Sequence, residues 1–351
     1  MSIPKGPQDL TPQWLTQALR ESGTIQEASV LSFTVDAIGQ EEGITGQLAR
    51  LTLAYDIQER DAPRTLVAKS PTPRTKGMHW RGREVLFYQQ IADHIEMPTP
   101  HCHFAGFDET GHSVLLLEDL APARGGDPIT RDNLPKAELA ICELAKLHAA
   151  WWDDPRLDEM DWLNRLDGAQ VEEIMRPRWD PFLHRAGHRL PDKTVIESLR
   201  KHLAYVTDQL YEPPPRTFRH NDYQPNNLLF ATPQGGVPFA VIDWGNVSHG
   251  RGTFDVAFYM CRGAPPQERR AIETGLLETY HTTLVENGVQ GYALDQCIDD
   301  YRLSTLFVLA RTGYIIAGNL SPTHQRRFVD TLLPRAYAAV TDLDAVELLS
   351  D

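Results

Sequence analysis

The stretch HNDYQPNN (residues 220–227) places a carboxylate, Asp222, five residues before an amide, Asn227, with a proline between them. An apolar run follows, and AVIDWGN (residues 240–246) then brings a second carboxylate, Asp243, at the end of another apolar run. A carboxylate is costly to bury unless it meets a cation, and carboxylate and amide oxygens suit Mg²⁺. The turn closed by Pro225 can aim Asp222 and Asn227 at one point. The pattern therefore predicts a site that holds a divalent cation and orients a hydroxyl group.

The bulk composition bounds the class of protein. The chain has 351 residues, 41% of them hydrophobic and 23% charged, which favours a folded protein of two lobes or domains. The net charge of −14 is not offset by a basic tract, so nucleic-acid binding is not expected. The four cysteines form no CxxC pair, and no stretch reaches the ~18 apolar residues of a membrane span. We expect a soluble cytoplasmic protein with no membrane partner.

The order of predicted elements changes along the chain. Residues 11–21 have an N-cap and an apolar helical face, residues 31–39, 47–57, 65–70 and 113–120 have strand patterns, and residues 82–93 have a helical one. Residues 134–152 and most of 265–349 are helical in pattern. The sequence therefore predicts an α+β protein with a small β-rich lobe over residues 1–120 and a larger helical lobe over residues 121–351.

Two features of the β-rich lobe suit phosphate binding. Lys69 ends an apolar strand, and Glu84 follows 15 residues later in a predicted helix, an arrangement that fixes a phosphate-binding lysine. The turn IGQEEGITGQ (residues 38–47) contains Gly43 and Gly46, which would let backbone N–H groups approach phosphates. Such turns are common in hairpins, and no Walker A sequence follows.

The end of VLLLEDL (residues 114–120) is a candidate for contact with an adenine edge. Strand exits leave backbone N–H and C=O groups without sheet partners, and Glu118 to Leu120 form such an exit. A simple linker between the lobes explains the local sequence equally well.

Taken together, these motifs resemble those of a known superfamily. HNDYQPNN resembles the H-G-D-x-x-P-x-N catalytic loop of the aminoglycoside phosphotransferase and choline kinase superfamily, relatives of protein kinases, and IDWG resembles its DFG element. LLLEDL, REVLFY and LAKLHAAWW are similar to segments of the ecdysteroid-kinase-like (CHK-like) branch and its bacterial relatives. The resemblance covers roughly residues 35–335 and implies a bilobal protein-kinase-like fold.

The resemblance also implies roles for individual residues. Asp222 would be the catalytic base that orients or deprotonates the acceptor hydroxyl, and Asn227 and Asp243 would bind Mg²⁺. His220 would be a scaffold of the loop, and Asp255 a structural anchor of the catalytic lobe. Lys69 with Glu84 would bind the phosphates of ATP or GTP, the phosphoryl donor, and residues 118–120 would form the adenine hinge. Asn221 stands where the family usually has glycine, and we expect it to alter the loop backbone but not the ligands.

We therefore predict an ATP-dependent kinase that transfers the γ-phosphoryl group to a small-molecule hydroxyl. Only twelve residues separate Asp243 from Asp255, too few for the activation segment with which a protein kinase docks a peptide. A protein-kinase-like enzyme and an inactive nucleotide-binding regulatory protein are the alternatives, although the second would be expected to lack Asp222, Asn227 or Asp243. The acceptor stays open, since the sequence allows an apolar or a cationic compound.

Overall fold

The computed structural model describes residues 2–38, 46–71, 82–163 and 166–349, and the chain forms two compact units. Unit 1 contains residues 1–124 together with residues 230–246, and unit 2 contains residues 125–229 and 247–351. The segment that carries Asp243 therefore belongs to the same unit as Lys69, although 174 residues separate them in sequence.

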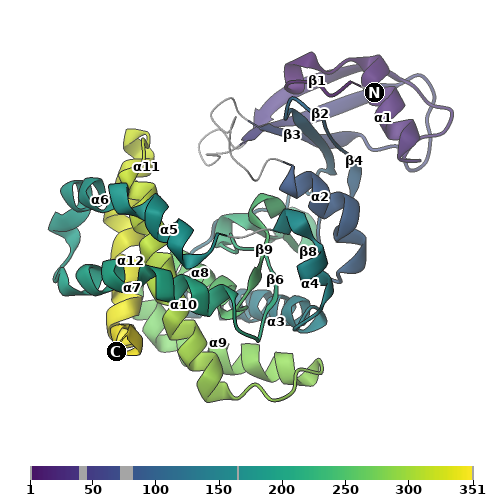
Figure 1. The fold of residues 1–351 in the computed structure, drawn as a ribbon. Helices are drawn as coiled ribbons and strands as arrows, with labels where there is room; N and C mark the ends of the chain where they lie inside the picture. The colour runs from purple at the N-terminus through teal and green to yellow at the C-terminus, as the bar shows by residue number, and fades with distance from the viewer. Residues whose placement is uncertain (1, 39–45, 72–81, 164–165, 350–351) are drawn as a thin grey trace. The chain divides into compact units, whose positions relative to one another are not determined.

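Unit 1 is built on a five-stranded antiparallel sheet with the strand order β1-β2-β3-β5-β4 (Figure 1). Its strands are β1 (Val30–Ile38), β2 (Gly46–Tyr55), β3 (Thr65–Pro71), β4 (Cys102–Phe107) and β5 (Ser113–Glu118). The register pairs Lys69 of β3 with Leu48 and with Leu115, so this lysine lies on a central strand.

A hydrophobic core holds α1 (Pro12–Glu21) against this sheet. The core includes Leu15 and Leu19 of the helix with Leu51 and Leu66 of the strands, all fully buried. The helix begins as its sequence predicts, because the Thr11 hydroxyl accepts a hydrogen bond from the Trp14 backbone N–H at 3.1 Å.

Unit 1 also contains α2 (Arg83–Gln90), β8 (Gly235–Val241) and most of β7 (Leu228–Thr232), which pairs with β8. The short 3₁₀ turn η9 (Trp244–Asn246) packs against α2. There the Trp244 indole stacks on the Phe87 ring with centroids 4.2 Å apart and planes 5° apart. This contact fixes the segment that follows Asp243 against the helix that carries Glu84.

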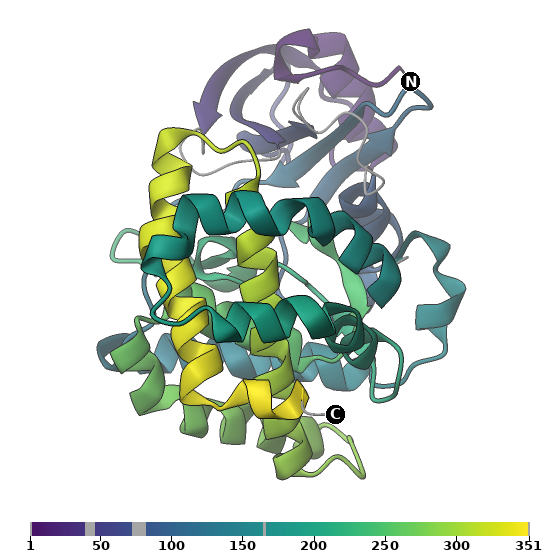
Figure 2. The same cartoon turned by 60° about the vertical axis from the view of Figure 1, so that its left-hand side comes forward.

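Unit 2 is mainly helical, with one small sheet of β6 (Thr217–Arg219) and β9 (Ser248–Gly250). The long helix α10 contacts α6, α7, α8 and α12, and α3 contacts α9 (Figures 1 and 2). The helices are α3 (Leu134–Ala150), α4 (Arg156–Glu159), α5 (Gly168–Met175), α6 (Trp179–Ala186), α7 (Thr194–Tyr211), α8 (Thr253–Gly263), α9 (Pro266–Glu286), α10 (Leu294–Ala317), α11 (Pro322–Arg326) and α12 (Leu333–Asp342).

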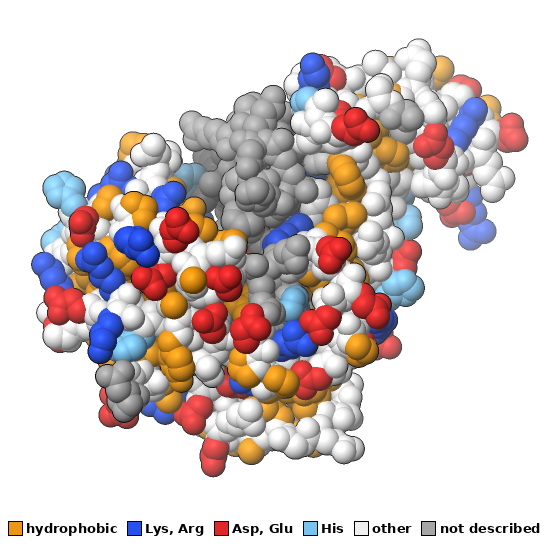
Figure 3. Space-filling model, in the orientation of Figure 1, with side chains coloured by type: hydrophobic (Ala, Val, Ile, Leu, Met, Phe, Trp, Pro, Cys, Tyr) orange, Lys and Arg blue, Asp and Glu red, His pale blue; other side chains and the backbone are white. Residues whose placement is uncertain are grey.

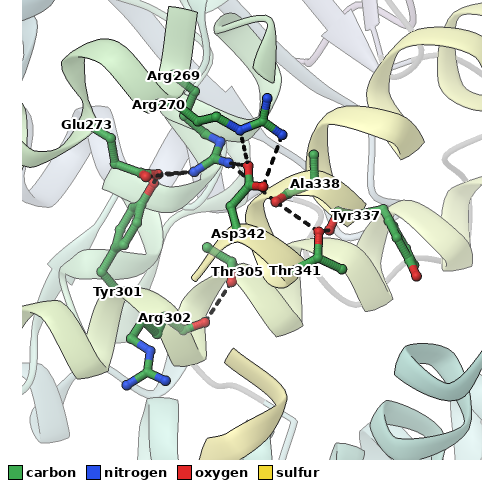
Figure 4. Close-up of polar contacts among 10 residues, drawn as sticks. All are labelled: Arg269, Arg270, Glu273, Tyr301, Arg302, Thr305, Tyr337, Ala338, Thr341 and Asp342. Carbon is green, nitrogen blue, oxygen red and sulfur yellow. Dashed lines mark hydrogen bonds and ion pairs between the residues drawn. The ribbon is translucent and has the colours of Figure 1, made fainter. Parts of the chain in front are cut away.

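A buried ionic network joins three of these helices (Figure 4). Arg269 of α9 donates to Glu273 at 2.6 Å and also pairs with Asp342 of α12, while Tyr301 of α10 donates to Glu273 at 2.5 Å. Arg269 is almost fully buried, and two carboxylates satisfy its charge. These contacts link α9, α10 and α12 to one another.

The structure confirms the predicted α+β composition and most of the predicted elements. Its main correction in unit 1 is β4, which the sequence analysis did not predict. The β4 segment CHFAGF (residues 102–107) does not alternate cleanly, because a register irregularity between Cys102 and Phe104 interrupts its pairing with β5.

Among the described residues, no helix is both long enough and apolar enough to cross a membrane. Acidic and basic side chains intermix on the face of unit 2 that is visible in Figure 3, so the net negative charge is not gathered into one patch on that face.

Candidate active site

In unit 1, the structure brings Lys69 together with two carboxylates. The Lys69 Nζ lies 2.8 Å from Glu84 Oε1 and 2.5 Å from Asp243 Oδ1. The side chains of Lys69 and Glu84 are about nine-tenths buried, whereas that of Asp243 is 30% exposed. The pairing of Lys69 with Glu84 follows the sequence spacing, whereas the contact with Asp243 depends on tertiary structure and could not be predicted from spacing.

Electrostatics keep the lysine of this cluster protonated. Burial lowers the pKa of Lys69, but the charges of Asp243 and Glu84 outweigh that effect and hold the pKa above its ordinary value. Burial raises the pKa of Glu84, and the nearby Asp243 charge adds to the rise, while Lys69 opposes it. A lysine that stays protonated beside an accessible carboxylate is suited to bind an anionic ligand.

The backbone aims Asp243 at the lysine. Asp243 has a φ of +65°, in the left-handed region that few residues other than glycine, asparagine and aspartate adopt. The next residue, Trp244, is fully buried and donates its indole N–H to the Val241 carbonyl at 3.1 Å. The strained residue is therefore held between the end of β8 and a well-packed tryptophan.

In unit 2, Asp255 anchors the loop that carries the opening motif. The buried Asp255 carboxylate accepts hydrogen bonds from the backbone N–H groups of His220 and Asn221, both at 2.8 Å. Asn221 has a φ of +62°, a conformation that glycine enters freely and asparagine tolerates. An asparagine at this position is thus compatible with the turn.

A further pair of side chains supports Asp255. The His148 Nε2 lies 3.4 Å from the Asp255 carboxylate, and His148 Nδ1 lies 2.8 Å from the Tyr280 hydroxyl. Burial lowers the pKa of His148 despite the carboxylate beside it. Burial raises the pKa of Asp255, but its contacts with His148 and the charges of His220 and Arg219 outweigh it, so the pKa is lowered overall. The group is an ionised carboxylate beside a neutral imidazole.

Asp222 and Asn227 contact each other, as the turn in their sequence suggests. The Asn227 Nδ2 donates to the Asp222 backbone carbonyl at 2.9 Å and lies 3.3 Å from Asp222 Oδ2. The imidazole of His220 accepts from the Asp222 N–H at 3.2 Å. His220 is fully buried, and its imidazole holds the backbone at Asp222. The Asp222 side chain itself is only part-buried.

Three of the remaining predicted site residues, Gly46, Glu118 and Leu120, lie in unit 1. Gly43 lies outside the described residues, and Gly46 begins β2. Glu118 ends β5, and its carboxylate accepts from the His101 N–H at 3.1 Å. Leu120 is buried, and its carbonyl accepts from the Ala123 N–H at 3.0 Å. No contact of these residues identifies a ligand, so their roles stay predictions.

The sequence analysis did not predict Arg311, which lies in the C-terminal part of α10. Its Nη1 donates to the Asn221 carbonyl at 2.5 Å, and its Nη2 lies 3.8 Å from Asp222 Oδ1. The signal was available in the sequence, because an arginine inside the apolar run TLFVLARTGYIIA must find a partner if it is buried. This pattern indicates that the arginine has a partner, but it does not identify that partner.

The donor chemistry of the predicted metal ligands fits Mg²⁺. Asn227 uses its Nδ2 toward Asp222, and in the described part of the chain no hydrogen bond reaches its Oδ1, which is the atom that would bind a cation. Asp243 contributes a part-exposed carboxylate. No group of three or more His, Cys, Asp and Glu among the described residues could hold a metal ion, but Mg²⁺ commonly takes only one or two protein ligands and fills its shell with water and substrate phosphate.

Comparison with known proteins identifies the family. Residues 52–286 match the model of the phosphotransferase enzyme family (APH), which is more than half of the chain. The chain therefore belongs to the phosphotransferase enzyme family. No curated protein sequence matches it.

Solved structures agree on the fold. An aminoglycoside 2'-phosphotransferase-IIIa in complex with GDP is 15% identical with a TM-score of 0.52, over 89% of this chain and 94% of that one. An ethanolamine kinase from Plasmodium vivax is 12% identical with a TM-score of 0.52, over 89% and 82%. A choline kinase from Cryptosporidium parvum Iowa II is 13% identical with a TM-score of 0.50, over 95% and 94%. The predictions of this superfamily, of a kinase-like α+β fold and of a phosphotransferase enzyme are confirmed.

Proposed function

We propose that the protein transfers the γ-phosphoryl group of ATP or GTP to a hydroxyl group of a small molecule, with Asp222 as the catalytic base. The observation that carries the proposal is the Lys69 cluster, in which one protonated lysine contacts both Glu84 and Asp243. Phosphoryl transfer needs little covalent chemistry from the protein and depends on positioning and charge neutralisation. Family membership and the nucleotide complexes of similar folds support the same reaction.

In the proposed step, the acceptor oxygen forms a bond to the γ-phosphorus while the bond from that phosphorus to the β,γ-bridging oxygen breaks. The acceptor proton passes to the Asp222 carboxylate, and the nucleoside diphosphate leaves. Asp255 and His220 hold the loop that presents Asp222. Lys69, positioned by Glu84, binds the nucleotide phosphates, and residues 118–120 contact the base.

Asn227 and Asp243 would hold Mg²⁺, which neutralises charge on the phosphates when it is bound. Gly43 and Gly46 would lie near the same phosphates. Unit 1 would thus bind the nucleotide, and the helices of unit 2 would bind the acceptor. We expect the enzyme to act in the cytoplasm.

Calorimetric titration of nucleotide with and without Mg²⁺, together with steady-state turnover, tests these roles. For Asp243→Ala, we expect Mg²⁺ to stop strengthening nucleotide binding and turnover to collapse. For Asp222→Asn, we expect near-normal nucleotide binding and turnover lower by about a hundredfold or more. Asn227→Ala should fall between these variants, because it removes one neutral ligand oxygen.

The outcomes separate the proposal from its alternatives. Normal turnover in all three variants would show that the assigned residues do not carry the reaction. Mg²⁺-dependent nucleotide binding without turnover by the parent protein on any acceptor would instead indicate an inactive nucleotide-binding regulator. Transfer to proteins, with none to small molecules, would indicate a protein-kinase-like enzyme.

A further inference from the structure

Four arginines of unit 2 lie close to one another, and one of them contacts the loop that carries Asp222. They come from four different segments: Arg262 from the end of α8, Arg311 from α10, Arg327 from the start of the π-helical segment η10 (Arg327–Leu332), and Arg335 from α12. Arg311 is the member that reaches the loop, through its contacts with the Asn221 carbonyl and Asp222. Arg335 donates to the Arg262 carbonyl, and Arg327 lies close enough to act on the charges of both.

Arg262 is the unusual member of the cluster. It is only 8% exposed, its Nε is buried without a hydrogen-bond partner, and no hydrogen bond or ion pair of its guanidinium group is found among the described residues. Its guanidinium carbon lies 4.7 Å from the centre of the Phe258 ring and 4.9 Å from that of Phe328. The Arg311 guanidinium lies 4.7 Å from the same Phe258 ring. Two cations thus share one aromatic ring near the catalytic loop.

Among the described residues, no carboxylate forms an ion pair with the Arg262 guanidinium group. Burial, together with repulsion by Arg311 and Arg327, lowers the pKa of Arg262 to about 9 against the attraction of Asp222. Burial and Arg327 also lower the pKa of Arg335, which donates to the Arg262 carbonyl at 2.7 Å.

The acidic residue of the neighbouring η10 segment does not pair with Arg262. Asp330 pairs with Arg189 at 2.6 Å. Asp222, which the proposed mechanism uses as a base, is the carboxylate that attracts Arg262.

A buried cation without a counter-ion is costly, and contact with aromatic faces offsets only part of that cost. Arginine presents a planar fork of donors that matches a carboxylate or a phosphate. The positive charges of these arginines would repel a cationic acceptor placed beside Asp222, whereas they would attract an anionic acceptor.

We propose that the acceptor is a hydroxyl compound that carries an anionic oxygen group, a carboxylate or a phosphate, and that Arg262 binds this group with the help of Arg311. The inference rests on the proposed function, because it identifies the bound compound as the phosphoryl acceptor. It differs from the apolar or cationic acceptor that the sequence allowed. In this arrangement Arg311 would contact the anionic group while it also donates to the carbonyl of Asn221.

Anion binding is tested first without catalysis. Thermal unfolding is followed with saturating MgADP, so that the nucleotide site is filled, and about 20 mM inorganic phosphate is then compared with chloride at equal ionic strength. We expect phosphate to raise the Tm of the parent protein by at least about 2 °C. Arg262→Gln should lose most of that rise, and Arg262→Lys, which keeps the charge but not the fork, should retain part of it.

Arg326→Gln is the matched control, because Arg326 is exposed and lies one residue before Arg327. It should keep the full phosphate effect. Each variant is compared with itself in chloride, so a change in its basal Tm does not affect the result. The proposal is overturned if phosphate gives the parent protein no specific rise, or if Arg262→Gln shows the same rise as the parent.

A turnover panel then distinguishes the two anionic groups and separates this inference from the proposed function. The panel pairs glycerate and glycerol 3-phosphate with glycerol, ethanolamine and kanamycin. We expect kcat/KM for at least one anionic acceptor to exceed that for the neutral and cationic ones by about tenfold or more. A cationic acceptor with the higher kcat/KM would contradict the inference while leaving the kinase function intact. Failure of MgADP to stabilise the protein would count against the proposed function, whereas the comparison of the parent protein with Arg262→Gln would still show whether phosphate binds at Arg262.

Discussion

Asp255→Asn tests how far one buried carboxylate maintains the loop that carries Asp222. In the parent protein, both Asp255 oxygens accept backbone N–H groups at 2.8 Å, those of His220 and Asn221. The asparagine amide keeps the shape and one acceptor oxygen, but its NH₂ group must face one of these donors. One buried N–H then loses its partner, at a cost of about 1–3 kcal/mol, and the remaining bond loses its charge assistance. The expected loss of stability is about 2–4 kcal/mol.

Thermal unfolding measures this loss. For a unit of this size, the loss corresponds to a fall in Tm of roughly 5–10 °C. Turnover should fall with it, because the conformation of Asn221 positions Asp222. Asp180→Asn is the control, since the Asp180 side chain is 87% exposed, and its Tm should stay close to that of the parent. A Tm for Asp255→Asn within 1 °C of this control would refute the assigned role of the carboxylate.

Three other changes have defined outcomes. Lys69→Ala should raise the KM for nucleotide strongly at saturating acceptor, and Glu84→Ala should do so more mildly because Asp243 still holds the lysine; near-parental kinetics for Lys69→Ala would contradict this. Trp244→Leu should lower the free energy of unfolding of unit 1 by about 2–4 kcal/mol in urea titration, since it removes a fully buried stacked ring; a loss below 1 kcal/mol would show that the stack is dispensable. Burial lowers the pKa of His103 to about 4. Below about pH 6.5 the unfolded chain therefore binds a proton at His103 that the folded protein does not bind until about pH 4. Stability should fall by up to about 3 kcal/mol between pH 6.5 and pH 4, and His103→Gln should flatten that slope; equal slopes would contradict the assignment.

The sequence predicted the parts of the fold that local chemistry determines. The Thr11 cap, the helix over residues 134–152 and the strand that ends near Lys69 all follow from patterns within one segment. The Lys69–Glu84 pair was also within reach, because one strand and the following helix are close in sequence.

Contacts across long separations were not predictable in this way. Residues 230–246 join unit 1 because of the tertiary structure, and this is what brings Asp243 to Lys69. Arg262 lies in the segment MCRG, where nothing local shows that two phenylalanine rings cover its guanidinium group. β4 was missed because an irregular pairing interrupts its alternation.

The central claim is that the terminal phosphoryl group of a nucleotide passes to a small-molecule hydroxyl through Asp222. The most direct measurement follows γ-³²P-labelled ATP with Mg²⁺, the purified protein and a fractionated metabolite extract, and compares the parent protein with Asp222→Asn. We expect label in a small-molecule fraction with the parent protein, and at least about a hundredfold less with the variant. Label confined to inorganic phosphate or to protein, or equal labelling of small molecules by both proteins, would contradict the central claim.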